Sequence, residues 1–278
     1  MHEQVKKRGI TYNEVRDYVR AQEATQLFMK PKRIKNFFPI VAKHKYEILQ
    51  VDLIDFSNIA TANENYKYLF VCIDVFSRQV FIIPLKNRNT EIITDAIDEV
   101  VEITAPSSIT SDNEFGTHAI KNYLKERGIN LQTVDVGEHH KLGIVNRFCR
   151  TIREKINKYM VMYNTRKYIN VLPKLVYNYN SSYHSGIKKV PNHVEEDDED
   201  IINLTNKKYN KAKLEETKFN IGDMVRFIIN KQQFEKGTLP HWSKTTHAIL
   251  TKNEHSYKLD NNKTYKYYEL QLVKNAII

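Results

Sequence analysis

Apolar residues change their spacing along the chain, which divides it into regions with different expected structure. Between residues 11 and 28 they recur at mostly helical spacing, with Thr11 placed to cap a helix and Glu14 three positions later, so we predict a short amphipathic helix. The next segment, KPKRIKNFFPIVAKHK, mixes basic and aromatic residues and is interpreted either as an extended segment over an acidic surface or as a solvated linker. We expect residues 1–44 to be a helical, basic N-terminal segment.

From Tyr46 the apolar residues form short runs rich in β-branched and aromatic side chains, which are typical of buried strands. Three such runs, YEILQVDLIDF, YKYLFVCIDVFS and RQVFIIPLK, are expected to pair as antiparallel neighbours. Helices and strands then alternate: a helix over 90–103, a strand in PSSITSD, a helix that Gly128 ends, a strand in INLQTVDV and a helix over 139–163. This order predicts a mixed α/β core over residues 45–195, with five strands buried between helices.

A different organisation is expected toward the C-terminus. After a helix that starts near Pro173, six consecutive acidic residues at 195–200 are interpreted as a solvated linker or a helix cap, and we predict an acidic and polar linker over 196–216. Short strands in KFNIGDMVRFII, HAILTKNEHSYKLD and TYKYYELQLV predict a small β-barrel over 217–275. The aromatic residues Phe234, Trp242 and Tyr257 are expected in its core.

Composition favours a nucleic-acid-binding protein. The formal net charge of +10 indicates a polyanionic partner, because each Lys or Arg placed on a phosphate releases counterions, although excess lysine can also serve solubility alone. The two cysteines, Cys72 and Cys149, have no paired spacing, so neither a disulfide framework nor a cysteine-based zinc site is expected. Since no run of about 18 apolar residues and no signal-peptide pattern occurs, we expect an intracellular protein with no membrane partner.

Two aspartates are the first candidates for chemistry. Asp52 lies inside a predicted strand and Asp112 at the end of another, 112 − 52 = 60 positions later, so a sheet could bring them side by side. Two carboxylates at strand ends and a third from a following helix form an all-oxygen Mg²⁺ site, and a pair of such ions assists in-line phosphodiester exchange. Because aspartate at a strand end is also a common turn residue, the pair alone does not identify a site.

Several motifs occur in a fixed order: QVDLID, YKYLFVCIDVFSRQVFIIPLK, ITSDNEF and GIVNRFCRTIREKI. Together they resemble the landmarks of retrovirus-like DDE integrases, above all those of Polinton (Maverick) elements and related viruses. The flanking segments LFMKPKRIKNFF, TRKYINVLPKLVYNYNSSYHSGIKKVP and KFNIGDMVRF also resemble parts of these proteins. The resemblance implies an RNase H-like core, a C-terminal SH3-like β-barrel, DNA as partner, Mg²⁺ as cofactor if the protein is active, a homo-oligomer and no small-molecule substrate.

The resemblance also implies the residues of the site. Asp52 and Asp112 match the first two metal-binding carboxylates of the family. The family's third carboxylate, a glutamate, is matched by Asn146, whose neutral amide is a weaker Mg²⁺ ligand and cannot take up a proton. After Asp112 the family pattern D-x-G-x-E-F is replaced by DNEF, which lacks two residues including the glycine. A loop that used glycine at positive φ would have to be rebuilt.

Other acidic or polar residues could replace the missing carboxylate. Glu154 follows Asn146 by eight positions, about 12 Å along a helix, which is too far for the same ion. Three residues before the helix could swing in, namely Glu138, His139 and His140.

Basic residues in two segments are expected to contact phosphates, with a solvated surface as the competing interpretation. On the helix after Asn146 they are Arg147, Arg150, Arg153, Lys155 and Lys158. Before the core, the contacts are expected from the basic run KPKRIK, with the charges assigned to positions 31, 33 and 34 of the chain.

Three hypotheses about function follow. The favoured one is an integrase-family DNA-binding protein of a mobile element or virus whose Mg²⁺-dependent strand transfer is impaired by Asn146. The second is an active strand transferase with a compensating third ligand. The third is an inactivated integrase retained as a structural or assembly protein. All three predict a location in a host nucleus, a viral factory or a virion.

Overall fold

The computed structural model of the chain describes residues 9–31, 38–134, 139–229 and 239–273. The chain divides into two compact units, one of residues 39–208 and one of residues 1–38 with 209–278, and each is described by itself. Within the described residues, no helix combines the length and the apolar character needed to cross a membrane.

The core unit is built on a five-stranded mixed sheet with the strand order β3-β2-β1-β4-β5. The first three strands are antiparallel neighbours, as predicted, whereas β4 and β5 run parallel to β1. This is the RNase H-like arrangement that the resemblance implied. The strands are β1 (Ile48–Asp55), β2 (Tyr68–Asp74), β3 (Val80–Leu85), β4 (Ser108–Ser111) and β5 (Asn130–Thr133).

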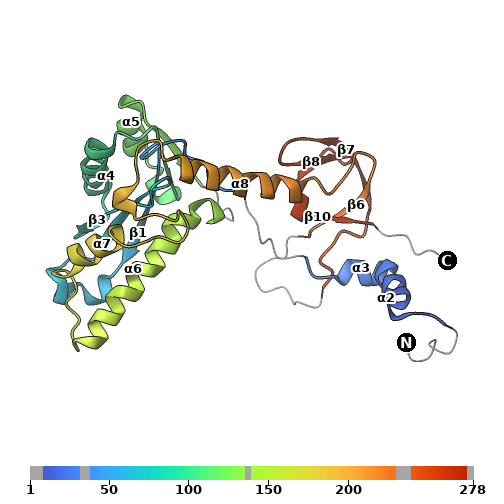
Figure 1. Cartoon of the computed structure of the whole chain (residues 1–278), viewed down its shortest axis with the longest axis horizontal. Coiled ribbons are helices and arrows are strands. Elements are labelled where there is room, and N and C mark those ends of the chain that lie inside the picture. The colour runs from blue at the N-terminus through green and yellow to red at the C-terminus, as the bar shows by residue number, and fades with distance from the viewer. Residues whose placement is uncertain (1–8, 32–37, 135–138, 230–238, 274–278) are drawn as a thin grey trace. The chain divides into compact units, whose positions relative to one another are not determined.

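Helices cover both faces of this sheet (Figure 1). The side chains of β1 alternate, so that Leu49 and Val51 pack under α4 (Thr90–Thr104) and α5 (His118–Glu126). Ile54 lies on the opposite face, under α6 (Gly143–Met162) and α7 (Leu172–Asn180). Gly128 has φ +72° just after α5, which confirms it as the residue that ends that helix.

Buried amide side chains fasten the loops around the core. Asn63 ends a 3₁₀ helix, η2 (Ser57–Asn63), and is fully buried. Its Nδ2 donates to the carbonyls of Ile59 and Arg166, both at 2.9 Å, and its Oδ1 accepts from the N–H groups of Tyr168 and Ile169. All four hydrogen-bonding positions of the amide are therefore used. The further short 3₁₀ helices are η3 (Asn113–Phe115), η4 (His139–Leu142), η5 (Pro191–His193) and η6 (Tyr267–Glu269).

The segment predicted as a polar linker is helical. It forms α8 (Glu199–Glu216), and the acidic run lies at the start of this helix, where carboxylates favour a helix N-terminus. Asp198 is buried and accepts from Lys189 Nζ at 2.7 Å, so this part of the run is not solvated. The two compact units divide between Lys208 and Tyr209, inside this helix. The domain boundaries at 45, 196 and 217 stay predictions.

The second unit contains an antiparallel sheet with the order β10-β6-β7-β8-β9. Its core includes Val225, Ile249, Leu259 and the fully buried Tyr257. Trp242 is buried as predicted, whereas Phe234 lies outside the described residues. The strands are β6 (Met224–Phe227), β7 (His247–Lys252), β8 (Tyr257–Leu259), β9 (Thr264–Tyr265) and β10 (Leu270–Leu272). The SH3-like character of this sheet stays a prediction.

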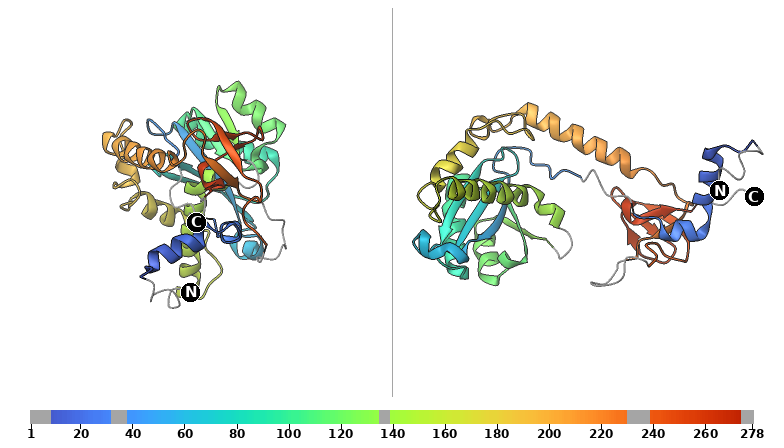
Figure 2. Two further views of the ribbon diagram at one scale, coloured as in Figure 1. Left: turned by 90° about the vertical axis from the view of Figure 1, so that its right-hand side faces the viewer. Right: turned by 90° about the horizontal axis from the view of Figure 1, so that it is seen from below.

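The N-terminal helical segment belongs to the second unit (Figure 2). The single helix predicted over 11–28 is wrong: extended backbone at Gln22 separates α2 (Tyr12–Ala21) from α3 (Glu23–Phe28). The capping box formed by Thr11 and Glu14 is confirmed.

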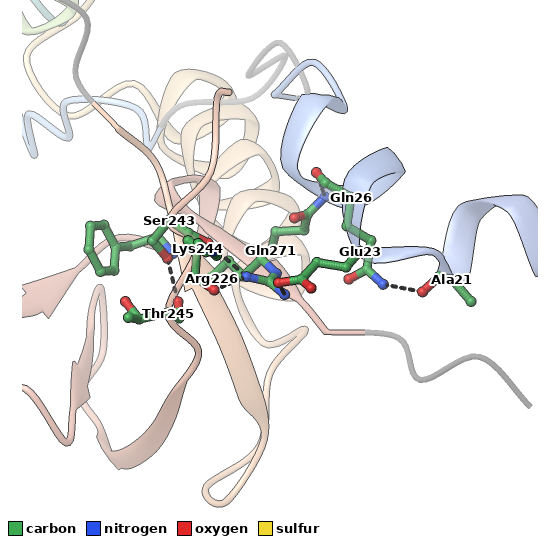
Figure 3. Close-up of polar contacts among 9 residues, drawn as sticks. Ala21, Glu23, Gln26, Arg226, Ser243, Lys244, Thr245 and Gln271 are labelled. Atoms are coloured by element: carbon green, nitrogen blue, oxygen red, sulfur yellow. Dashed lines mark hydrogen bonds and ion pairs between the residues drawn. The ribbon is translucent and has the colours of Figure 1, made fainter. Parts of the chain in front are cut away.

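Hydrogen bonds from residues more than 200 positions away hold α3 against the second sheet. Trp242 Nε1 donates to the Met29 carbonyl at 2.7 Å. Figure 3 shows the buried Arg226 reaching Glu23 at 3.2 Å through one guanidinium nitrogen, while another donates to the carbonyls of Ser243 and Lys244. Phe38, at the end of the segment predicted as extended, packs its ring on His255 at 4.4 Å. The part of the N-terminal segment up to Phe38 is therefore grouped with the C-terminal module, whereas residues 39–44 belong to the core unit.

We predict that deleting residues 1–29 shifts the fluorescence of Trp242, the single tryptophan, to longer wavelength, because its indole loses the cover and the hydrogen bond of α3. The thermal midpoint of the C-terminal module should fall in the same variant. Deletion of residues 1–8 is the matched control and should change neither. Unchanged emission after the longer deletion would show that α3 does not dock in solution.

Candidate catalytic and nucleic-acid-binding groove

The register between β1 and β4 brings the two predicted carboxylates together. Ile48, Leu49 and Gln50 of β1 lie opposite Ser108, Ile109 and Thr110 of β4, an offset of sixty positions. The offset from Asp52 to Asp112 is also sixty, so Asp112, directly after β4, lies level with Asp52 on the neighbouring strand, where strands are about 4.8 Å apart.

The electrostatics of Asp52 reflect this closeness. Burial raises the pKa of Asp52, and the charge of Asp112 adds to the rise. Hydrogen bonds from the Leu53 N–H, at 2.8 Å, and from the Cys149 thiol oppose it, as does the charge of Arg153. Burial also raises the pKa of Cys149, which keeps the thiol protonated and able to donate.

The turn after Asp112 contains no residue at positive φ. Asp112 caps the 3₁₀ helix η3, its Oδ1 accepting from the Glu114 N–H at 3.1 Å. Phe115 is fully buried in the core, and Gly116 has an ordinary negative φ of −78°. The shortened loop therefore needs no residue at positive φ, and Glu114 is paired with Arg88 at 2.9 Å.

A buried amide on β1 positions α6. Gln50 is fully buried two residues before Asp52, on the same face of the strand. Its Nε2 donates to the Lys141 carbonyl at 2.8 Å, and its Oε1 accepts from the Val145 N–H at 3.1 Å. These bonds hold the first turn of α6 against the centre of the sheet. We did not single out Gln50 from the sequence, although a glutamine inside an apolar strand was the available signal.

An open groove of about 920 Å³ runs from Asp52 along one side of α6. Its helical residues recur every three or four positions, so they form one stripe. The stripe is Asn146, Cys149, Arg150, Arg153, Glu154, Asn157, Lys158, Val161 and Met162. Asn146 lines the same groove as Asp52, and its match to the third carboxylate stays a prediction. Cys149, one turn further, was missed as a neighbour of Asp52.

The phosphate-contacting residues predicted on α6 separate into two groups. Arg150, Arg153 and Lys158 line the groove. Arg147 does not; its charge instead acts on Arg78 and His184, elsewhere on the core. Lys155 is exposed and is not a lining residue.

The phosphate contacts predicted before the core need correction at two of the three positions, 31 and 34. Position 31 is Pro31 and position 34 is Ile34, and neither side chain carries a charge or a hydrogen-bond donor, so neither can pair with a phosphate. The basic residues of this run are Lys30, Lys32, Arg33 and Lys35. Lys30 is exposed and Pro31 half-buried, both in the second unit, whereas positions 32–37, with Arg33 and Ile34, lie outside the described residues.

Of the acidic and polar residues considered for the third ligand, only Glu154 has a described side chain. Glu154 lines the groove but pairs with Lys158 at 2.7 Å. Glu138 and the side chains of His139 and His140 lie outside what the structure describes.

The donor set suits one divalent cation better than two. Two adjacent carboxylates are oxygen ligands of the kind Mg²⁺ prefers. The charge of Asp112 contributes to the raised pKa of Asp52, and a cation between the two would relieve this repulsion. Asn146 offers a neutral oxygen at the third position. Within the described part of the chain, no group of three or more His, Cys, Asp or Glu side chains is arranged to hold a metal ion.

The core has counterparts in known proteins. Residues 42–139 match the family described as Integrase core domain. This part of the chain is therefore similar to an integrase core domain. A transposon-derived protein of Caenorhabditis elegans is 33% identical over 185 residues, which are 65% of this chain and 62% of that protein. The Pol polyprotein of a radiation murine leukemia virus is 29% identical over 128 residues, 45% of this chain and 22% of the polyprotein. The chain therefore spans less than two thirds of the length of either relative.

A solved integrase structure supports the fold of the core. A chain of the intasome of simian T-cell lymphotropic virus, determined by cryo-electron microscopy with a PP2A regulatory subunit, aligns with a TM-score of 0.68. The alignment covers 98% of this chain and 94% of that one at 13% sequence identity, so the likeness is one of fold.

We predict that Gln50→Ala lowers the free energy of unfolding by about 2 to 3 kcal/mol, because the buried Val145 N–H loses its acceptor. Urea unfolding of the core measures this. Gln132→Ala makes the same chemical change at an exposed position of β5 and should alter stability by less than about 0.5 kcal/mol. Equal effects of the two changes would contradict the anchoring role of Gln50.

Proposed function

We propose that this chain is a DNA-binding integrase-family protein of a mobile element or virus, with strand transfer impaired at its third metal ligand. The observation that carries the proposal is the groove, where Asp52 shares one surface with Arg150, Arg153 and Lys158, and where an amide, Asn146, stands beside it. Cations spaced along a helix favour the phosphate backbone of DNA, which such contacts bind without reading base sequence.

The impairment follows from the number of carboxylates. Mg²⁺ bound at such a site activates the attacking hydroxyl and stabilises the leaving oxygen of a phosphodiester. In this chain Asp52 and Asp112 would hold the ion, and the groove's arginines would hold the DNA strand. Asn146 adds no charge to balance a second ion, so affinity for that ion and turnover should both be low.

A second candidate is an active strand transferase with an unusual third ligand. The observation in its favour is that Asp52 and Asp112 keep the sheet register that places them side by side. Glu138 and the neighbouring histidines are the residues from which such a ligand would come. A third candidate is an inactivated integrase that serves in assembly, for which the exposed Val161, Met162 and Tyr163 at the end of α6 offer an apolar contact.

Finer parts of the proposal rest on the sequence. The order of the motifs from QVDLID to GIVNRFCRTIREKI supports the Polinton type within the integrase family. A homo-oligomer, Mg²⁺ as cofactor, an SH3-like C-terminal module and a location in a nucleus, viral factory or virion belong to the same proposal. Light scattering of the protein with and without DNA tests the oligomer.

We predict that the protein shows no or very slow nicking and strand transfer with Mg²⁺ or Mn²⁺, and that Asn146→Glu raises the rate on the order of 100-fold, about 2.7 kcal/mol of barrier. Adding Asp52→Asn to that variant should abolish the gain. If the unmodified protein already carries out strand transfer at a substantial rate and Asp52→Asn abolishes it, the second candidate is correct and the proposal of an impaired enzyme is wrong.

DNA binding is tested by its dependence on salt. We predict that Arg150→Gln reduces the slope of log Kd against log salt by about 1, because one phosphate contact is lost. Lys155→Gln removes the same charge from the same helix, outside the groove, and should leave the slope nearly unchanged. Equal losses for the two variants would show that DNA does not lie in the groove.

A further inference from the structure

A second concentration of positive charge lies on the core, apart from the groove. It comprises Arg78 from the β2–β3 turn, Arg147 from the second turn of α6, His184 after α7, and Lys208 from α8, and we refer to these four residues as the basic cluster. They are separated by as many as 130 positions in sequence, so the fold brings them together. The function proposed above assigns no role to Arg78, His184 or Lys208.

Apolar packing assembles the segments that carry the cluster. Val75 and Phe76, next to Arg78, share a hydrophobic core with Ile187 and with Ile201 of α8, and Ile144 of α6 packs against the same core. The ring of Tyr179 then lies between α6 and His184, with its centroid 4.7 Å from Phe148 and 6.1 Å from the imidazole. The positions of the four basic side chains are therefore set by buried contacts around them.

The basic side chains of the cluster lack direct carboxylate partners. Between described residues, no carboxylate forms an ion pair with Arg78, Arg147 or Lys208. Asp74, whose charge acts on Arg78, accepts instead from the N–H groups of Tyr46, Phe76 and Ser77 and from the Ser77 hydroxyl. The one hydrogen bond of the Arg78 guanidinium between described residues goes to the Val75 carbonyl, which leaves most of its donors available.

Burial and neighbouring charges both shift the pKa values of the cluster. Burial lowers the pKa of Arg78 to about 10; the charges of Asp74 and Tyr179 oppose this fall, and the charge of Arg147 adds to it. Burial lowers the pKa of His184, and Arg78 and Arg147 lower it further. The pKa of Lys208 is lowered by burial and by Arg78 and Lys188. An anion bound among these residues would be attracted to their positive charges and would raise their pKa values.

The backbone at and next to the cluster has unusual conformations. Arg78 and Lys188 have φ values of +64° and +62°, in the left-handed region that non-glycine residues rarely adopt. A Cβ on Gly186 would lie 2.8 Å from His184 Cε1, so glycine makes room for the imidazole. The Gly186 N–H donates to His184 Nδ1 at 3.1 Å, which leaves Nε2 as the protonated nitrogen of the neutral ring and a donor to an incoming oxygen.

We propose that Arg78, Arg147, His184 and Lys208 form a phosphate-binding site separate from the groove at Asp52. Arginine forks, an ammonium and an imidazole N–H together match the acceptor oxygens of a phosphate dianion or ester. Asp74 of β2 lies opposite Leu49, which is three residues, or about 10 Å, along β1 from Asp52. Arg78 follows Asp74 in the chain, so a single phosphate cannot contact both Arg78 and Asp52. The site does not depend on strand transfer.

The test is titration of the full chain with pyrophosphate by calorimetry at pH 7 and fixed ionic strength. The double variant Arg147→Gln/Lys208→Gln should bind at least tenfold more weakly than the unmodified protein. The control, Lys155→Gln/Lys207→Gln, removes the same charge from the same two helices outside the cluster and should bind as the unmodified protein does. Absence of binding to the unmodified chain, or equal weakening in both variants, would overturn the proposal.

A second measurement separates binding from a structural role of these residues. In histidine-selective NMR titrations, pyrophosphate should raise the pKa of His184 in the unmodified protein and leave it unchanged in the double variant. Gly186→Ala, which displaces the imidazole, should weaken pyrophosphate binding while the protein stays folded. An unresponsive His184 at saturating pyrophosphate would place the anion elsewhere and refute the site.

Competition between DNA and pyrophosphate identifies the source of the phosphate. If a short DNA duplex displaces pyrophosphate, and the double variant reduces the salt slope of DNA binding by about 2, the site holds a backbone phosphate of DNA. If DNA and pyrophosphate bind together, the site serves a free phosphate compound. Arg150→Gln should retain pyrophosphate binding in either case, so failure of the groove and failure of this site are distinguishable.

Discussion

The buried amide of Gln50 is the contact on which the arrangement of the groove depends. It joins the central strand β1 to the first turn of α6, and it lies two residues from Asp52 on the same face of that strand. Successive residues of a helix point about 100° apart, so a rotation of α6 by one position would replace Asn146 beside Asp52 with a neighbour. Because both hydrogen bonds of Gln50 are buried, such a rotation would leave unpaired polar groups inside the core, and the helix is therefore locked in phase with the sheet.

Helix α6 serves two surfaces at once. Its groove stripe carries Arg150, Arg153 and Lys158, and its buried stripe carries Phe148, Ile152 and Ile156. Arg147 projects from the edge between them toward the segments that hold Arg78 and His184. Because both basic surfaces include residues of one helix, the distance between them is fixed. A single ligand that contacts both surfaces must match this distance, whereas two small ligands can bind independently.

Local pattern and counting predicted much of the core. Short runs rich in β-branched and aromatic residues located the first three strands, and Gly128 marked the end of a helix. The sixty-residue interval between Asp52 and Asp112 proved equal to the offset of the paired strands. Contacts between distant segments were not accessible in this way. Glu23 pairs with Arg226, 203 positions away. The segments that carry Arg78 and His184 are joined by apolar residues that look like ordinary core in the sequence. Helix α8 was missed because its lysines and asparagines suggested a solvated linker, while its acidic start and Ile201 secure it.

In the function proposed above, the charge balance of the groove favours binding of DNA over retention of metal ions. Its charged lining residues are Arg150, Arg153 and Lys158 against Asp52 and Glu154, and Asp112 on the strand beside Asp52 brings the carboxylates to three as well. A glutamate at position 146 would give the carboxylates an excess of one, and bound cations would then be needed before a phosphodiester could approach without net repulsion. With Asn146 the charges balance without a metal, and Arg153 acts as a counter-charge of Asp52. Under that proposal, one neutral side chain shifts this surface away from a metal-dependent arrangement and toward DNA binding.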